Sequence, residues 1–266
     1  MTPLASLKGP ARHDKKSEKI GPRRFRLVGA FAISLALNMI ALAVTLDVIA
    51  GRGGIAYLKA RVTHDSEAIV NPAYVQRETL FQAMTHPPVD AHPVVFLGDS
   101  LTAGCEWREL FGNRLLILNR GIGGDTSAGV LKRSPEVAAL QPRAVFLMVG
   151  TNDLQDLGYA PADTVRNYRE IIAILRQSSP VRIYLESLLP TQAPKFNHWS
   201  EQVNEQIRAL ADGKSILYVN LRDAFLENGS LDKNLTVDGI HLNGSGYLVW
   251  KKQIDPMVAE LDQAAN

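Results

Sequence analysis

The sequence predicts an α/β protein whose main domain is a mainly parallel, five-stranded sheet covered by helices on both faces. At 266 residues, with 46% apolar and 21% charged residues, the chain has room for one sizeable core. From about residue 93 onward, short apolar runs alternate with longer segments in which apolar residues recur at spacings of three and four. Such alternation requires right-handed crossovers, and these place parallel strands between two layers of helices.

The five strand candidates are too short for helices and rich in branched residues. They are residues 94–97, 115–118, 144–149, 181–186 and 216–220. Amphipathic helices are predicted between and after them, because apolar residues share one helical face in three segments. These segments are residues 165–175, 203–210 and 249–258.

An uncharged run of twenty residues, LVGAFAISLALNMIALAVTL, occupies residues 27–46. A helix of that length spans the roughly 30 Å hydrocarbon core of a bilayer. Eight lysines and arginines precede the run within residues 1–26, against two acidic residues, and Asp47 follows it. By the positive-inside rule we predict a basic cytoplasmic tail at 1–26, a transmembrane signal-anchor at 27–50, and an extracytoplasmic body, either periplasmic or extracellular.

A cleaved signal peptide is the alternative for this segment, since Ala41, Leu42 and Ala43 offer a suitable pattern of small residues. The leading segment is long and the apolar run continues past that site, so the uncleaved anchor is favoured. Residues 51–92 are predicted to form a stalk or linker with a helix near residues 72–84. The prolines of HPPVDAHP, at the end of this stalk, are expected to keep the backbone extended where it leads into the domain at 93–266.

Charge and cysteine content exclude some functions. The net charge of the whole chain is +2 and that of residues 1–26 is +6, so the rest is near −4. A mildly acidic body does not provide the basic surface that nucleic-acid binding requires. The single cysteine, Cys105, excludes an internal disulfide, and no cationic neighbour favours its thiolate, so a structural role is predicted.

Polar, glycine-rich stretches follow three of the predicted strands, and a fourth lies near the C-terminus. In chain order they are FLGDSLTAG at 96–104, NRGIGGDT at 119–126, VGTND at 149–153 and DGIHLNGSGY at 238–247. The carboxyl ends of parallel strands meet at one edge of a sheet, which is where such folds bind their ligands. We therefore expect these four segments to converge.

Together the four segments contain the parts of a serine-based acyl-transfer site. A serine needs a general base within hydrogen-bond reach, and that base needs a third group to orient it. His241 has a carboxylate three residues before it, so Asp238 can hold its Nδ1 proton while Nε2 faces Ser100. Oxyanion donors are available from the backbone N–H groups of Gly124 and Ser100 and from the Asn152 amide.

Other kinds of site are disfavoured by local sequence. GIGGD does not continue as a dinucleotide loop, because Thr126 stands where the third glycine belongs. The pattern G-x-S-x-G of α/β-hydrolases is absent around Ser100, since Thr102 replaces its second glycine. The remaining histidines show no metal-ligand spacing, so neither a metal nor another cofactor is expected.

The order and content of the four segments resemble the SGNH (GDSL-type) hydrolase family over about residues 94–258. The resemblance implies a three-layer α/β/α sandwich with a flavodoxin-like sheet. It also implies Ser100 as nucleophile, His241 as base and Asp238 as its orienting acid. Ser100, Gly124 and Asn152 would form the oxyanion hole.

Within that family, the sequences GIGGDT, LLPT and HLNGSGY are most similar to those of platelet-activating-factor acetylhydrolases and carbohydrate O-acetylesterases. This implies hydrolysis of a short acyl ester, such as acetyl, on a small molecule or an envelope carbohydrate or lipid. Lysophospholipase or thioesterase activity, acyl transfer to an acceptor, and a non-catalytic envelope-binding role stay open. The oligomeric state is left open as well.

Overall fold

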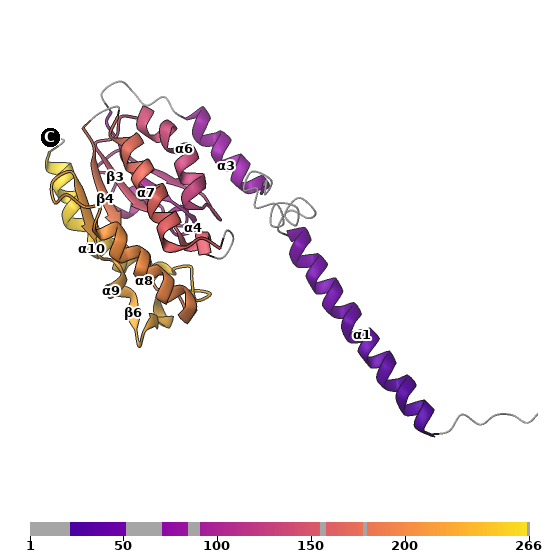
Figure 1. Ribbon diagram of the computed structural model, residues 1–266. Helices are drawn as coiled ribbons and strands as arrows, with labels where there is room; N and C mark the ends of the chain where they lie inside the picture. The colour runs from indigo at the N-terminus through magenta and orange to yellow at the C-terminus, as the bar shows by residue number, and fades with distance from the viewer. Residues whose placement is uncertain (1–21, 52–70, 85–90, 155–157, 178–179, 265–266) are drawn as a thin grey trace, which may run out of the picture. The chain divides into compact units, whose positions relative to one another are not determined.

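The computed structural model describes residues 22–51, 71–84, 91–154, 158–177 and 180–264, and the chain divides into two compact units at residues 54 and 55. The described part of the first unit is helix α1, Pro22–Gly51. The second unit contains a five-stranded sheet with helices on both faces (Figure 1). This confirms the predicted three-layer α/β/α sandwich.

Helix α1 covers the segment predicted as a membrane anchor. Over the residues whose side chains the structure describes, no helix combines the length and the apolar character needed to cross a membrane. Residues 27–30, 32 and 48–50 of the predicted anchor lie outside that set, as do residues 1–26 of the predicted tail and residues 51–70 and 85–90 of the predicted stalk. The membrane span therefore stays a prediction from the sequence.

All strands of the central sheet are parallel, in the order β2-β1-β3-β4-β5. Their bounds are Val94–Gly98 for β1, Ile117–Gly121 for β2, Ala144–Met148 for β3, Arg182–Glu186 for β4 and Ile216–Val219 for β5. Four of the predicted strands agree with these to within a residue. The second is displaced, because Asn119, Arg120 and Gly121 pair with β1 instead of entering the loop.

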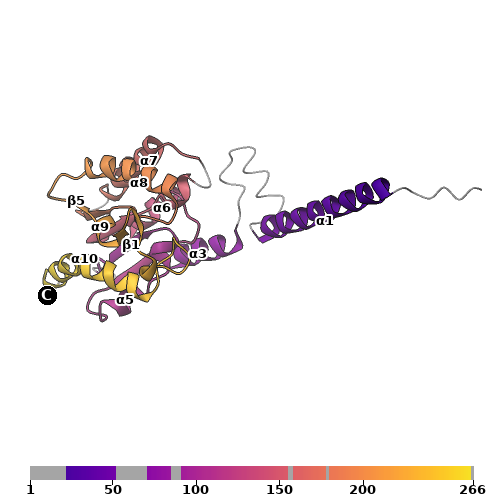
Figure 2. The same ribbon diagram turned by 90° about the horizontal axis from the view of Figure 1, so that it is seen from below.

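The helices form the outer layers of the sandwich. Figure 2 shows α6, α7 and α8 on one side of the sheet and α5 and α10 on the other. Their bounds are Ser127–Ala139 for α6, Pro161–Leu175 for α7, Pro194–Arg208 for α8, Trp107–Leu110 for α5 and Gly244–Gln263 for α10. The three predicted helical segments fall within or at the ends of α7, α8 and α10.

Shorter elements complete the second unit. Helix α3, Pro72–Ala83, is the helix expected within the stalk. The others are α4 at Ser100–Ala103, α9 at Arg222–Phe225, the β6–β7 hairpin of Leu226–Glu227 and Ser230–Leu231, and the 3₁₀ helix η3 at Lys233–Leu235.

Aromatic rings on adjacent strands make up much of the core on one face of the sheet. Phe96 of β1, Phe146 of β3 and Tyr184 of β4 stack with ring centroids 4.7 and 4.4 Å apart. Trp107 stacks on Phe96 at 4.2 Å and meets Trp250 of α10 edge-on at 5.0 Å. Stacked and edge-on aromatic pairs add to the free energy gained by burial, so these rings fix the distance between sheet and helices.

One buried carboxyl lies within this core. Glu186 ends β4, is fully buried, and accepts a hydrogen bond of 2.7 Å from Trp250 Nε1. Burial raises the pKa of Glu186 from its usual 4.5 to about 8. The folded protein therefore keeps a proton on Glu186 at pH values where the unfolded chain has lost it.

We predict that this proton makes stability depend on pH. Between about pH 4.5 and 8 the folded state keeps a proton on Glu186 that the unfolded state has lost, so Glu186 makes the free energy of unfolding decrease as pH rises through that range. Glu186→Gln keeps the oxygen that accepts from Trp250 but does not titrate. Urea unfolding of both proteins at pH 5, 6, 7 and 8 should show a shallower decrease for the variant. Burial also raises the pKa of Asp99, to about 7, but Asp99 is present in both proteins, so its effect on the pH dependence cancels when they are compared. Equal slopes for the two proteins would contradict the prediction.

Candidate active site

Ser100 lies at the carboxyl edge of the sheet, as the first residue of α4 and two residues after β1 ends. Gly98 permits the tight turn, because a Cβ atom there would overlap the Met148 carbonyl oxygen and the Thr102 hydroxyl. Asp99 is fully buried and caps α4 by accepting a 3.0 Å hydrogen bond from Leu101 N. The serine is therefore placed by a glycine and an aspartate that have separate structural roles.

Ser100, His241 and Asp238 form one hydrogen-bonded series. The Ser100 Oγ atom is 3.0 Å from His241 Nε2, although 141 residues separate the two in sequence. His241 Nδ1 lies 2.7 Å from Asp238 Oδ2. The structure thus brings together the three side chains that the sequence predicts for nucleophile, base and orienting acid.

Asp238 is held as an acceptor by its own turn. Its Oδ1 atom accepts hydrogen bonds from the backbone N–H of His241, at 2.7 Å, and of Ile240, at 3.0 Å. The bond to the His241 ring, and after it these backbone bonds, lower the pKa of Asp238 to about 2. Asp238 is therefore a carboxylate throughout the neutral pH range and fixes the orientation of the imidazole.

The backbone around His241 is fixed by further bonds. Thr236 Oγ1 donates to the His241 carbonyl at 2.7 Å and accepts from Gly239 N at 3.0 Å. Gly239 has a φ of +89°, a left-handed conformation that favours glycine. Gln192 N donates to the Gly239 carbonyl at 2.9 Å, so the loop after β4 supports the histidine loop.

Gly124 and Asn152, the other predicted oxyanion donors, lie in loops that are hydrogen-bonded to each other. Gly124 follows β2 with a φ of +75°, and a Cβ atom there would meet nothing within 4 Å, so its conformation accounts for the glycine. Asn152 follows β3 and donates from Nδ2 to the Asp125 carbonyl oxygen at 2.7 Å. The Asn152 amide is thereby tied to the residue directly after Gly124.

Sequence reasoning did not foresee the buried ion pair behind these loops. Arg133 of α6 donates from Nε to Asp125 Oδ2 at 2.8 Å and from Nη2 to the Gly98 carbonyl at 2.9 Å. Both side chains are almost fully buried. One arginine thus links the turn before Ser100 to the loop that contains Gly124. Asp125 belongs to the GIGGDT segment, but a lone arginine inside a helix gives no signal of burial.

A second unforeseen network surrounds Asp153, the residue after Asn152. Asp153 is fully buried, and its Oδ1 accepts from Ser127 N at 2.8 Å. Its Oδ2 accepts from Ser127 Oγ at 2.5 Å and from Thr164 Oγ1 at 2.6 Å. Because these donors begin α6 and line α7, Asp153 joins both helices to the turn that contains Asn152.

Metal-ligating side chains and the single cysteine can be located among the described residues. Among these residues, no group of three or more His, Cys, Asp or Glu side chains could hold a metal ion. Cys105 is buried, and burial raises the pKa of its thiol to about 12. The thiol is therefore protonated at neutral pH, as a structural role requires.

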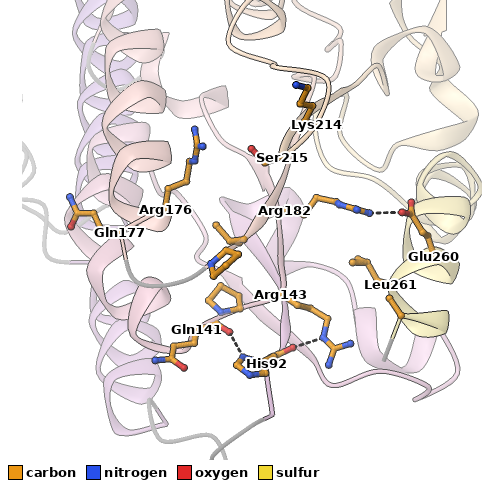
Figure 3. A pocket seen from close by; sticks show the side chains of 14 residues that line it. His92, Gln141, Arg143, Arg176, Gln177, Arg182, Lys214, Ser215, Glu260 and Leu261 are labelled. Atoms are coloured by element: carbon orange, nitrogen blue, oxygen red, sulfur yellow. Dashed lines mark hydrogen bonds and ion pairs between the residues drawn. The ribbon is translucent and has the colours of Figure 1, made fainter. Parts of the chain in front are cut away.

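A hollow of about 1060 Å³ lies at the opposite, amino-terminal edge of the sheet (Figure 3). It is lined by residues at or before the starts of β1, β3, β4 and β5 and by the C-terminal end of α10. Arg182 pairs there with Glu260 at 2.6 Å, and Arg143 donates to the His92 carbonyl at 2.8 Å. Ser100 and His241 do not line this hollow, so it is distinct from the predicted catalytic residues.

Comparison with known protein families matches the part of the chain that contains the four predicted segments. Residues 96–249, more than half of the chain, match the GDSL-like Lipase/Acylhydrolase family. The chain belongs to this family. It is accordingly an acylhydrolase, a carboxylic ester hydrolase. The matched range includes all four predicted segments, whereas α1 and α3 lie outside it.

Individual relatives agree with membership of the GDSL-like family. Platelet-activating factor acetylhydrolase IB subunit alpha2 of Rattus norvegicus is 27% identical over 179 residues, 63% of this chain and 76% of the relative. The isoamyl acetate-hydrolyzing esterase of Saccharomyces cerevisiae is 23% identical over 196 residues, 66% of this chain and 80% of that one. A GDSL-like lipase structure from Bacteroides thetaiotaomicron matches at 25% identity with a TM-score of 0.59, over 71% of this chain and 98% of the other.

The Asp153 network generates a prediction about stability. Asp153→Ala removes the acceptor of three buried donors, so it should lower the free energy of unfolding by about 2–4 kcal/mol. Asp163→Ala is the control, because Asp163 lies in the first turn of α7 near the surface and pairs with exposed Arg166. That variant should lose about 1 kcal/mol or less. Urea unfolding measures the free energy of unfolding of both variants. Similar decreases in the two would contradict the prediction that the buried bonds of Asp153 contribute more to stability.

Proposed function

We propose that Ser100 is the nucleophile of this acylhydrolase, His241 its general base and Asp238 the acid that orients His241. The single observation that carries the proposal is the 3.0 Å distance between Ser100 Oγ and His241 Nε2, with Asp238 on the other ring nitrogen. A neutral imidazole bonded in this way carries its proton on Nδ1 and presents the Nε2 lone pair to the hydroxyl.

The proposed reaction is two-step acyl transfer to water. Ser100 Oγ attacks the ester carbonyl while His241 Nε2 takes its proton, and His241 then protonates the leaving alcohol. Water repeats the sequence on the acyl-enzyme and releases the acid, which regenerates Ser100. The imidazolium formed in both steps is stabilised by the ionised Asp238, whose low pKa keeps its charge in place.

Charge that develops on the carbonyl oxygen needs fixed donors, and we assign them to Ser100 N–H, Gly124 N–H and the Asn152 amide. Their placement is supported by the turn at Gly98, the left-handed Gly124 and the bond from Asn152 to the Asp125 carbonyl. Donors held by such contacts do not have to reorganise as charge appears, which is the condition for efficient electrostatic stabilisation.

The proposed substrate is an ester of a short acyl group, acetyl in the first instance. The molecule that bears this acyl group is proposed to be an envelope carbohydrate or lipid. Two relatives are named for acetyl esters: platelet-activating factor acetylhydrolase and the isoamyl acetate-hydrolyzing esterase. The envelope part of the proposal rests on the sequence of residues 1–50, which predicts a cytoplasmic tail and a membrane anchor before an extracytoplasmic body.

Hydrolysis of p-nitrophenyl esters from acetyl to palmitoyl tests the activity and the chain length together. We expect the full chain to hydrolyse acetyl and butyryl esters at least tenfold faster than the palmitoyl ester. Ser100→Ala should retain its fold, by circular dichroism, and lose at least about 10³-fold in kcat. A folded wild-type chain that is inert on every ester would overturn the short-acyl proposal, and an active alanine variant would overturn the role of Ser100.

Cell fractionation tests the proposed anchor. The full chain of 29.2 kDa should remain in the membrane pellet after an alkaline carbonate wash, because a spanning helix is not released by disrupting ionic contacts. Intact-mass measurement of the pelleted protein should give the uncleaved chain. A shorter chain beginning after the Ala41–Ala43 region and found in the soluble fraction would instead indicate a cleaved signal peptide.

A further inference from the structure

Helix α3 lies outside the residues that match the family, yet its polar side chains contact the loop that contains Gly124. We propose that Tyr74 and Arg77 of α3 are positioning residues, which hold the Gly121–Asp125 segment so that Gly124 and Asn152 are aligned for the oxyanion. The proposal rests on the oxyanion roles proposed above. It assigns a part in catalysis to a segment that the sequence placed in a stalk.

Helix α3 is docked on the hydrolase unit by an aromatic contact. Phe81 is 6% exposed, and two guanidinium groups lie over its ring, those of Arg77 at 5.0 Å and Arg120 at 4.6 Å. At the same end of α3, Gln82 Nε2 donates to Glu136 of α6 at 3.0 Å. Cation–π contacts of this kind hold Arg77 in one orientation.

Arg77 reaches the backbone where β2 ends. Its Nε donates to the Gly121 carbonyl at 3.1 Å. Gly121 is in register with Gly98 of β1, and a Cβ atom at Gly121 would overlap the backbone of Ala103 in α4. Arg77 therefore holds a residue that packs directly against the helix beginning with Ser100.

Tyr74 reaches the other end of the same segment. Its hydroxyl lies 3.4 Å from Asp125 Oδ1, while the Asp125 carbonyl accepts from Asn152 Nδ2 at 2.7 Å. Gly129 of α6 is needed here, because a Cβ atom would overlap Asp125 Oδ1 and come within 3.2 Å of the Tyr74 hydroxyl. One residue, Asp125, thus connects α3 to the proposed oxyanion donor.

Both ends of the Gly121–Asp125 segment are therefore held from α3, and Gly124 lies between them. Donors stabilise an oxyanion only when they are placed accurately, and a misplacement of about 1 Å costs on the order of 10²-fold in rate. Loss of the two α3 contacts permits a smaller displacement, for which we expect about a tenfold decrease in kcat. Because the displaced donors act on the transition state, KM should stay within about twofold.

The test uses the full chain with Tyr74→Phe and Arg77→Met combined. Phenylalanine removes only the hydroxyl, and methionine keeps an apolar stem beside Phe81 but removes the donor. Hydrolysis of p-nitrophenyl acetate, normalised by active-site titration with a p-nitrophenyl phosphonate, should show the tenfold loss in kcat. Gln82→Ala is the matched control, since it removes a contact of the same helix that does not reach the oxyanion loop; its kcat should equal that of the wild type.

A double-mutant cycle with Asn152→Ala separates positioning from general destabilisation. If α3 acts through both oxyanion donors, Tyr74→Phe/Arg77→Met should lower kcat by only about threefold further once the Asn152 amide is gone, because Gly124 N–H is then the one donor of the pair left to be displaced. A full tenfold loss in that background, an unchanged kcat in the wild-type background, or an equal loss in Gln82→Ala would each overturn the proposal. An active Ser100→Ala, or an Asn152→Ala variant with wild-type kcat, would instead refute the proposed function on which it rests.

Discussion

The close approach of two pairs of backbone segments behind Ser100, β1 to β3 and β2 to α4, is the constraint on which the rest of the site depends. Gly98 lies against the Met148 carbonyl of β3, and Gly121 lies against Ala103 of α4. A side chain at either position would separate β1 from β3 or β2 from α4. Since Ser100, Gly124 and Asn152 follow these strands directly, their spacing is inherited from contacts that only glycine permits.

Buried polar side chains then hold the loops at this edge of the sheet in fixed positions. Arg133 donates hydrogen bonds to both the Gly98 carbonyl and Asp125. Asp153 accepts hydrogen bonds from residues of α6 and α7. Buried charges are costly unless they are fully hydrogen-bonded, so each network favours one arrangement of its loops over others. The nucleophile and the proposed oxyanion donors therefore rest on neighbouring, cross-linked supports.

Much of the architecture could be predicted from local patterns. The three inner strands β1, β3 and β4 are short, mainly apolar runs, because they are buried on both faces, and amphipathic spacing marks α7, α8 and α10. The edge strand β2 was misplaced because half of it is polar. Asn119 of that strand donates to the carbonyls of Thr102, Ala103 and Cys105, a role in capping α4 that has no periodic signal.

The sequence by itself determined the fold class, the family, and which residue types are available for acyl transfer, because catalysis needs particular groups next to particular turns. Only the tertiary structure decided how these groups are supported. The contacts of Asn152 with Asp125, of Arg133 with Gly98 and of Tyr74 with Asp125 span 27, 35 and 51 residues. Pairings over such separations follow from how strands and helices pack, and an isolated arginine or tyrosine carries no local sign of its partner.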